Sequence, residues 1–159
     1  MSSINFSHAG AAEMMMVLMG GTTKPTSFKL ILWNGYVAPV VAMSEIVTYA
    51  QLVQPVLTGY AEKALTAPAS TLGNFQANEI PNITWPQQSY LFNALSPTYT
   101  GGPILGCAVV ASTGTLVFYS VFSSPFQPVG GADTLTVDIT LELGNLLGGP
   151  GGGNAITGF

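Results

Sequence analysis

Residues 134–143 alternate between polar and apolar side chains without a break, and this pattern leaves few folds open to the chain. The apolar positions are Leu135, Val137, Ile139, Leu141 and Leu143, and each follows a Thr, Asp or Glu. Successive side chains of a strand point to opposite faces of a sheet, so the segment predicts a strand with one dry and one solvated face. Such a strand needs neighbours in a sheet and a core against its dry face.

A second pair of segments predicts an antiparallel hairpin that is apolar on both faces. Residues 104–111 and 115–122 flank the turn Ser112-Thr113-Gly114 and contain few polar residues. One face can line the core of the domain, whereas the other needs a second cover. The N-terminal helix, a long loop at 67–84 or a neighbouring subunit could supply that cover, and we expect the neighbouring subunit.

Short segments separated by Gly and Pro make up most of the remaining chain. We expect strands at 28–34, 59–66 and 89–94, a helical turn at 44–49 and an irregular connection at 67–84. Residues 9–19 predict a short helix with Glu13 in its first turn and a buried Met-rich half, ended by Gly20 and Gly21. The predicted fold is mainly β, an antiparallel β-sandwich or jelly-roll-like domain with a short N-terminal helix.

The predicted organisation is one domain with extended terminal arms. Residues 1–21 form an N-terminal arm and the short helix, residues 22–143 the β-sandwich domain, and residues 144–159 a glycine-rich C-terminal arm. Such a composition behaves as a linker when it is free. We expect both arms to lie across neighbouring molecules, and the domain to stay folded when residues 1–8 or 145–159 are removed.

Charged residues are unusually scarce. The 159 residues include three lysines, no arginine and seven acids, whereas an ordinary domain is about one-quarter charged. Disorder does not explain this composition, because 48% of the chain is apolar. A neutral surface protects a free monomer poorly against self-association, so it favours a subunit covered by partners. Without a basic patch, we expect no binding to nucleic acid.

The residues that usually carry chemistry are too few to form a site. His8 is the only histidine and Cys107 the only cysteine, so a catalytic triad, a zinc site and an internal disulfide all lack side chains. Asp138 and Glu142 would lie about 13 Å apart on a strand, farther than paired glycosidase carboxyl groups. We expect no enzyme activity, no cofactor and no small-molecule substrate.

The Met-rich cluster at 14–19 is not expected to meet a membrane. A signal peptide has Lys or Arg before its apolar segment, but neither precedes this cluster. The cluster is also too short to span a bilayer. We expect the protein to have no membrane partner and to be made and retained in a cytoplasm.

The order of several short motifs resembles a family of small virion proteins of tailed phages, described as phage structural, head-decoration or minor tail proteins. The resemblance covers most of residues 5–143. In chain order the motifs are an Asn-x-x-x-Ala-Gly opening with a Met-rich helix ending in Gly-Gly (5–21), a Lys-Leu-x-Leu strand (29–32), a Gly-Tyr-Ala-x-Lys-x-Leu segment (59–65), an aromatic Pro-Gln-Gln-x-aromatic segment (85–90), a glycine-started hairpin (106–122) and a Gly-x-Asp-Thr-Leu-Thr-Val strand (131–137).

The resemblance implies a virion structural protein without catalytic residues. We expect a capsid decoration or cement protein on the capsid exterior, with the major capsid protein and copies of itself as partners. Binding to an assembled lattice would stabilise that lattice by mass action. Two alternatives stay open: a tail, collar or fibre component, and a carbohydrate-binding adhesin that uses Trp33, Tyr36, Trp85 and Tyr90. The candidate assembly contacts are Ile4, Phe6, Val110, Phe118, Leu146, Leu147, Ile156 and Phe159.

Overall fold

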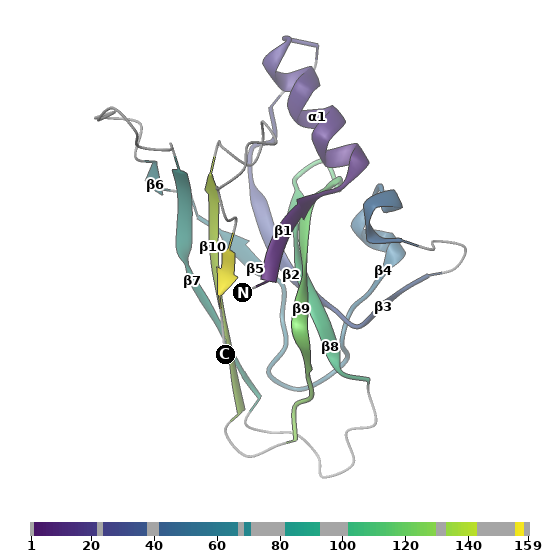
Figure 1. Cartoon of the computed structure of the whole chain (residues 1–159), viewed down its shortest axis with the longest axis vertical. Coiled ribbons are helices and arrows are strands. Elements are labelled where there is room, and N and C mark those ends of the chain that lie inside the picture. Colours follow the sequence, from purple (N-terminus) through teal and green to yellow (C-terminus); the bar gives the residue numbers. More distant parts are fainter. Residues whose placement is uncertain are drawn as a thin grey trace.

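The computed structural model describes residues 2–21, 24–37, 42–66, 69–70, 82–92, 102–129, 133–142 and 155–157. In these ranges the chain is mainly β, with antiparallel strands and one α-helix, α1 (His8–Leu18), so the predicted fold class is confirmed (Figure 1). The strands are β1 (Ser2–Phe6), β2 (Phe28–Trp33), β3 (Gly35–Tyr36), β4 (Leu52–Val53), β5 (Lys63–Leu65), β6 (Ala69–Ser70), β7 (Asn82–Phe92), β8 (Ile104–Ala111), β9 (Leu116–Phe126), β10 (Asp133–Glu142) and β11 (Ala155–Thr157), with 3-10 turns η1 (Met43–Glu45) and η2 (Tyr49–Gln51).

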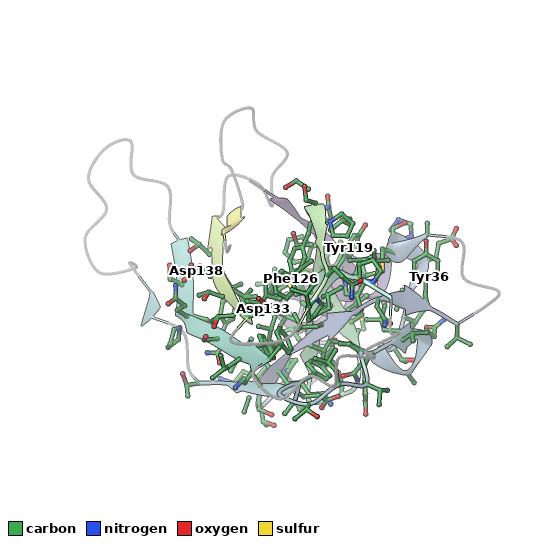
Figure 2. The ribbon with its side chains drawn as sticks, turned by 90° about the horizontal axis from the view of Figure 1, so that it is seen from below. Tyr36, Tyr119, Phe126, Asp133 and Asp138 are labelled. Atoms are coloured by element: carbon green, nitrogen blue, oxygen red, sulfur yellow. The ribbon has the colours of Figure 1, made fainter. Side chains whose placement is uncertain are left out.

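Nine of the described strands form one sheet that folds back on itself. Their order is β5-β2-β8-β9-β1-β11-β10-β7-β6, and β3 pairs separately with β4. The two halves of the sheet face each other across a common core, to which β7 and β10 contribute from one side and β2, β8 and β9 from the other (Figure 2). The largest buried side chains of this core include Leu30, Leu32, Tyr90, Phe92, Ile104, Leu135 and Ile139.

The alternating segment forms β10, as predicted. Leu135, Val137 and Ile139 are at most 1% exposed, whereas Thr134 on the opposite face is exposed. The predicted 104–122 hairpin is also confirmed, because β8 pairs with β9 across the expected turn. These two elements supply much of the core.

Strand β7 begins at Asn82, well before the predicted start near residue 89. The first half of this strand was not predicted, because residues 67–84 are rich in turn formers and because Pro86 has no backbone N–H to donate to a neighbouring strand. The structure accommodates Pro86 in a β-bulge: Val137 pairs with Gln88 and Ile139 with Trp85, so Pro86 and Gln87 together face Asp138. The Gln87 side-chain amide donates to both Asp138 carboxylate oxygens, at 2.9 and 3.0 Å.

The second apolar face of the hairpin is covered by the chain itself. Met43, Ile46 and Leu52 pack over Ile31, Trp33, Ala108, Val110 and Leu116 in a second buried cluster. Backbone hydrogen bonds hold the covering segment in place, including one from the Leu116 N–H to the Val47 carbonyl at 3.0 Å. The expectation that a neighbouring subunit covers this face is therefore wrong. The covering residues are too widely spaced in sequence to show a periodic pattern.

Both described terminal segments are strands of the chain's own sheet, in contrast to the predicted arms. Strand β1 lies between β9 and β11, and β11 lies between β1 and β10 (Figure 1). Removing residues 1–8 would delete an interior strand, so we no longer expect a folded domain after that truncation.

Candidate assembly surface

Helix α1 is fixed to the sheet at its first turn by Ser7, Gly10 and Val117. The buried Ser7 hydroxyl accepts a hydrogen bond from the Gly10 N–H at 2.8 Å and donates one to the Leu116 carbonyl. The Ser7 N–H donates to the Val117 carbonyl at 3.2 Å. A Cβ atom on residue 10 would lie only 2.0 Å from that carbonyl oxygen, so glycine is needed for this close approach. We call these three residues the α1 joint.

The second half of α1 displays apolar side chains outward. Met14 packs against the core, but Met15, Met16, Leu18 and Met19 are 66%, 49%, 81% and 83% exposed. We call these four residues the α1 tip. The helix extends beyond the ends of the strands (Figure 1). The predicted burial of the Met-rich half is therefore wrong for the α1 tip within this chain.

Glu13 lies in the second turn of α1, not in the first, because the helix begins at His8. Its carboxylate accepts a hydrogen bond from the Thr113 hydroxyl at 2.9 Å. This contact ties the middle of the helix to the turn between β8 and β9. The α1 tip beyond it carries no formal charge.

Three of the predicted assembly contacts belong to the core. Val110 and Phe118 are 0% and 2% exposed, so they are not surface contacts. Phe6 is half-buried and meets Phe118 edge to face, with ring centroids 6.1 Å apart. These residues are apolar because they pack inside this chain, in its two buried clusters.

The other five predicted contacts lie toward the chain ends. Ile4 and Ile156 occupy β1 and β11, where the backbone pairs with neighbouring strands. Leu146, Leu147 and Phe159 lie outside the described residues. Of the five predicted contacts that the structure describes, three therefore belong to the core and two lie on paired strands.

Three of the four aromatic residues considered for carbohydrate binding are buried. Trp33, Trp85 and Tyr90 are 3%, 6% and 0% exposed, and only Tyr36, at 38%, presents part of its ring. A sugar stacks on an exposed ring face. These four residues therefore do not form a stacking platform in this structure.

A hollow of about 350 Å³ lies beside Trp33 and Tyr36. It lies near an interruption of the β8–β9 ladder, where Ile104 pairs with Phe126 but Gly106 pairs with Val121. Its lining includes Trp33, Tyr36, Met43, Leu105, Val121 and Phe122. Figure 2 places Tyr36 toward one side of the molecule and Asp138 toward the other. The hollow can hold an apolar group.

A polar cluster joins β2 to the segment before β5. The Lys29 ammonium lies 2.6 Å from a Glu62 carboxylate oxygen, and the Gln54 amide donates to the other oxygen at 2.9 Å. Partial burial alone would raise the pKa of Glu62, but these hydrogen bonds outweigh it and lower that pKa overall. Tyr60 donates to Gln54, and burial raises the pKa of Tyr60 to about 12. The cluster links two elements through a partly exposed ion pair and its hydrogen bonds.

Replacing Glu62 by glutamine should lower the free energy of unfolding by less than about 1 kcal/mol at neutral pH, because partly exposed ion pairs contribute little. The pKa of Glu62 is lower in the folded chain than in the unfolded one. Its contribution is therefore fully present above about pH 4.3, where unfolded glutamate titrates, and is lost as pH falls through the folded pKa. Denaturant titrations across this range should show Glu62→Gln and wild type converging in acid. A stability difference as large in strong acid as at neutral pH would contradict this explanation. Glu45→Gln, which replaces an exposed acid elsewhere in the chain, is the matched control.

Within the described ranges, no group of three or more His, Cys, Asp or Glu side chains is arranged to hold a metal ion. No described helix has the length and apolar character needed to cross a bilayer. No protein-family model, curated protein or solved structure matches the chain, so the α1 tip, the hollow and the polar cluster have to be interpreted from their own geometry.

Proposed function

We propose that this chain is a non-enzymatic structural subunit of a tailed-phage virion, a decoration or cement protein that binds the outside of the assembled capsid and stabilises it. Its partners in this proposal are the major capsid protein and neighbouring copies of itself, and it is made in the host cytoplasm. The main support for the proposal is the α1 tip, an exposed apolar surface at the end of a helix whose first turn is fixed to the sheet.

The α1 tip is contiguous rather than scattered. Met15 and Met19 are four residues apart and Met15 and Leu18 three apart, so their side chains are neighbours on the helix surface. Single exposed apolar residues are common, but apolar patches mark interaction sites. Methionine side chains also adapt to irregular partner surfaces. These properties suit a docking surface for another protein.

The charge distribution supports a permanently covered contact. Residues 14–21 carry no formal charge, so a partner could cover the α1 tip without desolvating an ionised group. The whole chain carries only three lysines and seven acids. The order of motifs that resembles phage head-decoration proteins supports the same role.

The double variant Leu18→Gln/Met19→Gln should fold normally but bind capsids at least about 100-fold more weakly, because burying each apolar side chain contributes roughly 1.5–3 kcal/mol. Folding stability should change by less than about 0.5 kcal/mol, since both side chains are exposed in the free chain. Co-sedimentation with capsids that lack the native protein, over a dilution series, measures the affinity. Val56→Gln is the matched control, because Val56 is 93% exposed and lies away from α1.

Unchanged capsid binding by the α1 tip variant would contradict the proposal. Imaging of whole particles distinguishes the two virion locations. Copies arranged with the icosahedral symmetry of the capsid would support a decoration protein. A three-, six- or twelve-fold ring on the tail axis would replace it by a tail or collar component.

A further inference from the structure

We propose that β11 is an exchangeable strand, which can leave the slot between β1 and β10 of its own chain and fill the same slot in a second copy. The exchange would link neighbouring subunits in the virion role proposed above. It does not depend on that role, because it is a property of the purified chain.

The slot is defined by the strand pairing. One edge of β1 pairs with β9 and one edge of β10 pairs with β7, while β11 pairs with the remaining edge of each. Ile156 is the central residue of β11 and is the register partner of Ser2 on one side and Ile139 on the other. Among the described strands, β11 therefore connects the two halves of the sheet at this position.

The connection to β11 is much longer than its own chain requires. Antiparallel neighbours are usually joined by two to five residues. Residues 143–154 separate β10 from β11, although the register places the ends of this connection only about 8 Å apart. A connection of that length reaches about 40 Å when fully extended. It therefore has the reach to place β11 in an adjacent molecule.

Leaving the slot disrupts little structure, and entering another copy restores it. Among the described residues, β11 has two register pairs with β1 and two with β10. Because a backbone hydrogen bond contributes little net free energy to folding, opening these few pairs costs far less than global unfolding. The slot of a second copy has the same sequence and register, so exchange recovers every contact at low cost. The Ala-Ile-Thr strand carries no charge that would oppose its transfer.

Disulfide trapping tests the exchange. Ser3 and Ala155 are register partners on β1 and β11, at the separation of directly paired strand residues, which a disulfide can bridge. One tagged chain carries Ser3→Cys and a differently tagged chain carries Ala155→Cys. The native Cys107 can stay, since it is fully buried and burial raises the pKa of its thiol. Ser3→Cys mixed with Ser112→Cys, in the exposed β8–β9 turn, reports random collisions.

We expect disulfide-linked dimers that contain both tags, well above the level of the collision control. Their yield should rise with protein concentration and become dominant above about 1 mM, the effective concentration that a short linker gives to closure within one chain. The double variant Ser3→Cys/Ala155→Cys reports whether the register forms at all. Mixed-tag dimers no more abundant than the control would overturn the exchange, and so would a double variant that forms no disulfide within or between chains. Neither result bears on capsid binding through the α1 tip.

Discussion

Replacing Gly10 by alanine should lower the free energy of unfolding by about 3 kcal/mol. The added Cβ would lie 2.0 Å from the Val117 carbonyl oxygen and 2.6 Å from two other backbone atoms of the same residue. Backbone atoms within a paired strand cannot move aside as a flexible side chain can. Either α1 must shift or β9 must distort, and both disrupt the α1 joint. Denaturant titration measures the change.

The sign of this effect separates two physical explanations. Helix propensity alone predicts that Gly→Ala within a helix stabilises a protein by about 1 kcal/mol. The α1 joint predicts the opposite sign. Gly102→Ala is the control, because nothing in the described part of the chain, apart from the adjacent residues, lies within 4 Å of the added methyl group. A Gly10→Ala variant as stable as wild type, or more stable, would show that α1 does not approach β9 this closely. The same variant should also weaken capsid binding, since the α1 joint positions the α1 tip.

Replacing Trp85 by alanine should cost about 3–5 kcal/mol, the range for truncating large buried aromatic side chains. Trp85 is 6% exposed and connects the two halves of the folded sheet. Its ring, on β7, lies 6.4 Å from the Phe28 ring on β2 and 6.0 Å from the Phe118 ring on β9, centroid to centroid. Thermal and denaturant unfolding should both show the loss.

Two further variants show whether burial is the cause. Leu91→Ala, on the same strand but 46% exposed, should cost less than about 1 kcal/mol. Trp85→Phe retains an aromatic ring and removes an indole N–H that has no hydrogen-bond partner among the described residues, so it should cost less than about 1.5 kcal/mol. A Trp85→Ala variant no less stable than Leu91→Ala would show that the two sheet halves do not pack around this ring.

The strongest local patterns predicted their elements well. The alternation at 134–143 predicted β10 and its dry face, and Ser112-Thr113-Gly114 predicted the β8–β9 turn, because both signals depend on adjacent residues. Strand β7 was missed over its first half, because Pro86 argues against a strand unless a bulge receives it. That bulge depends on the pairing partner Asp138, which is distant in sequence.

The candidate surface was less predictable than the fold. Val110 and Phe118 were expected to contact partners, but both are buried. Residues 43–52 cover Val110, and the facing half of the folded sheet covers Phe118. The α1 tip was expected to be buried. One signal could have identified it: consecutive apolar residues surround a helix on all sides, so a helix at the edge of a small domain must expose some of them.

Local sequence patterns were enough to predict that this chain forms antiparallel strands around an apolar core, and that any interface it makes involves few charges. Both conclusions depend on composition and on the direction of neighbouring side chains, which local geometry dictates. Long-range contacts were needed to establish which apolar residues are exposed, that the described terminal segments pair within one sheet, and that Gly10 lies against Val117. These features arise from contacts between residues far apart in sequence, and such contacts leave no periodic pattern in the chain.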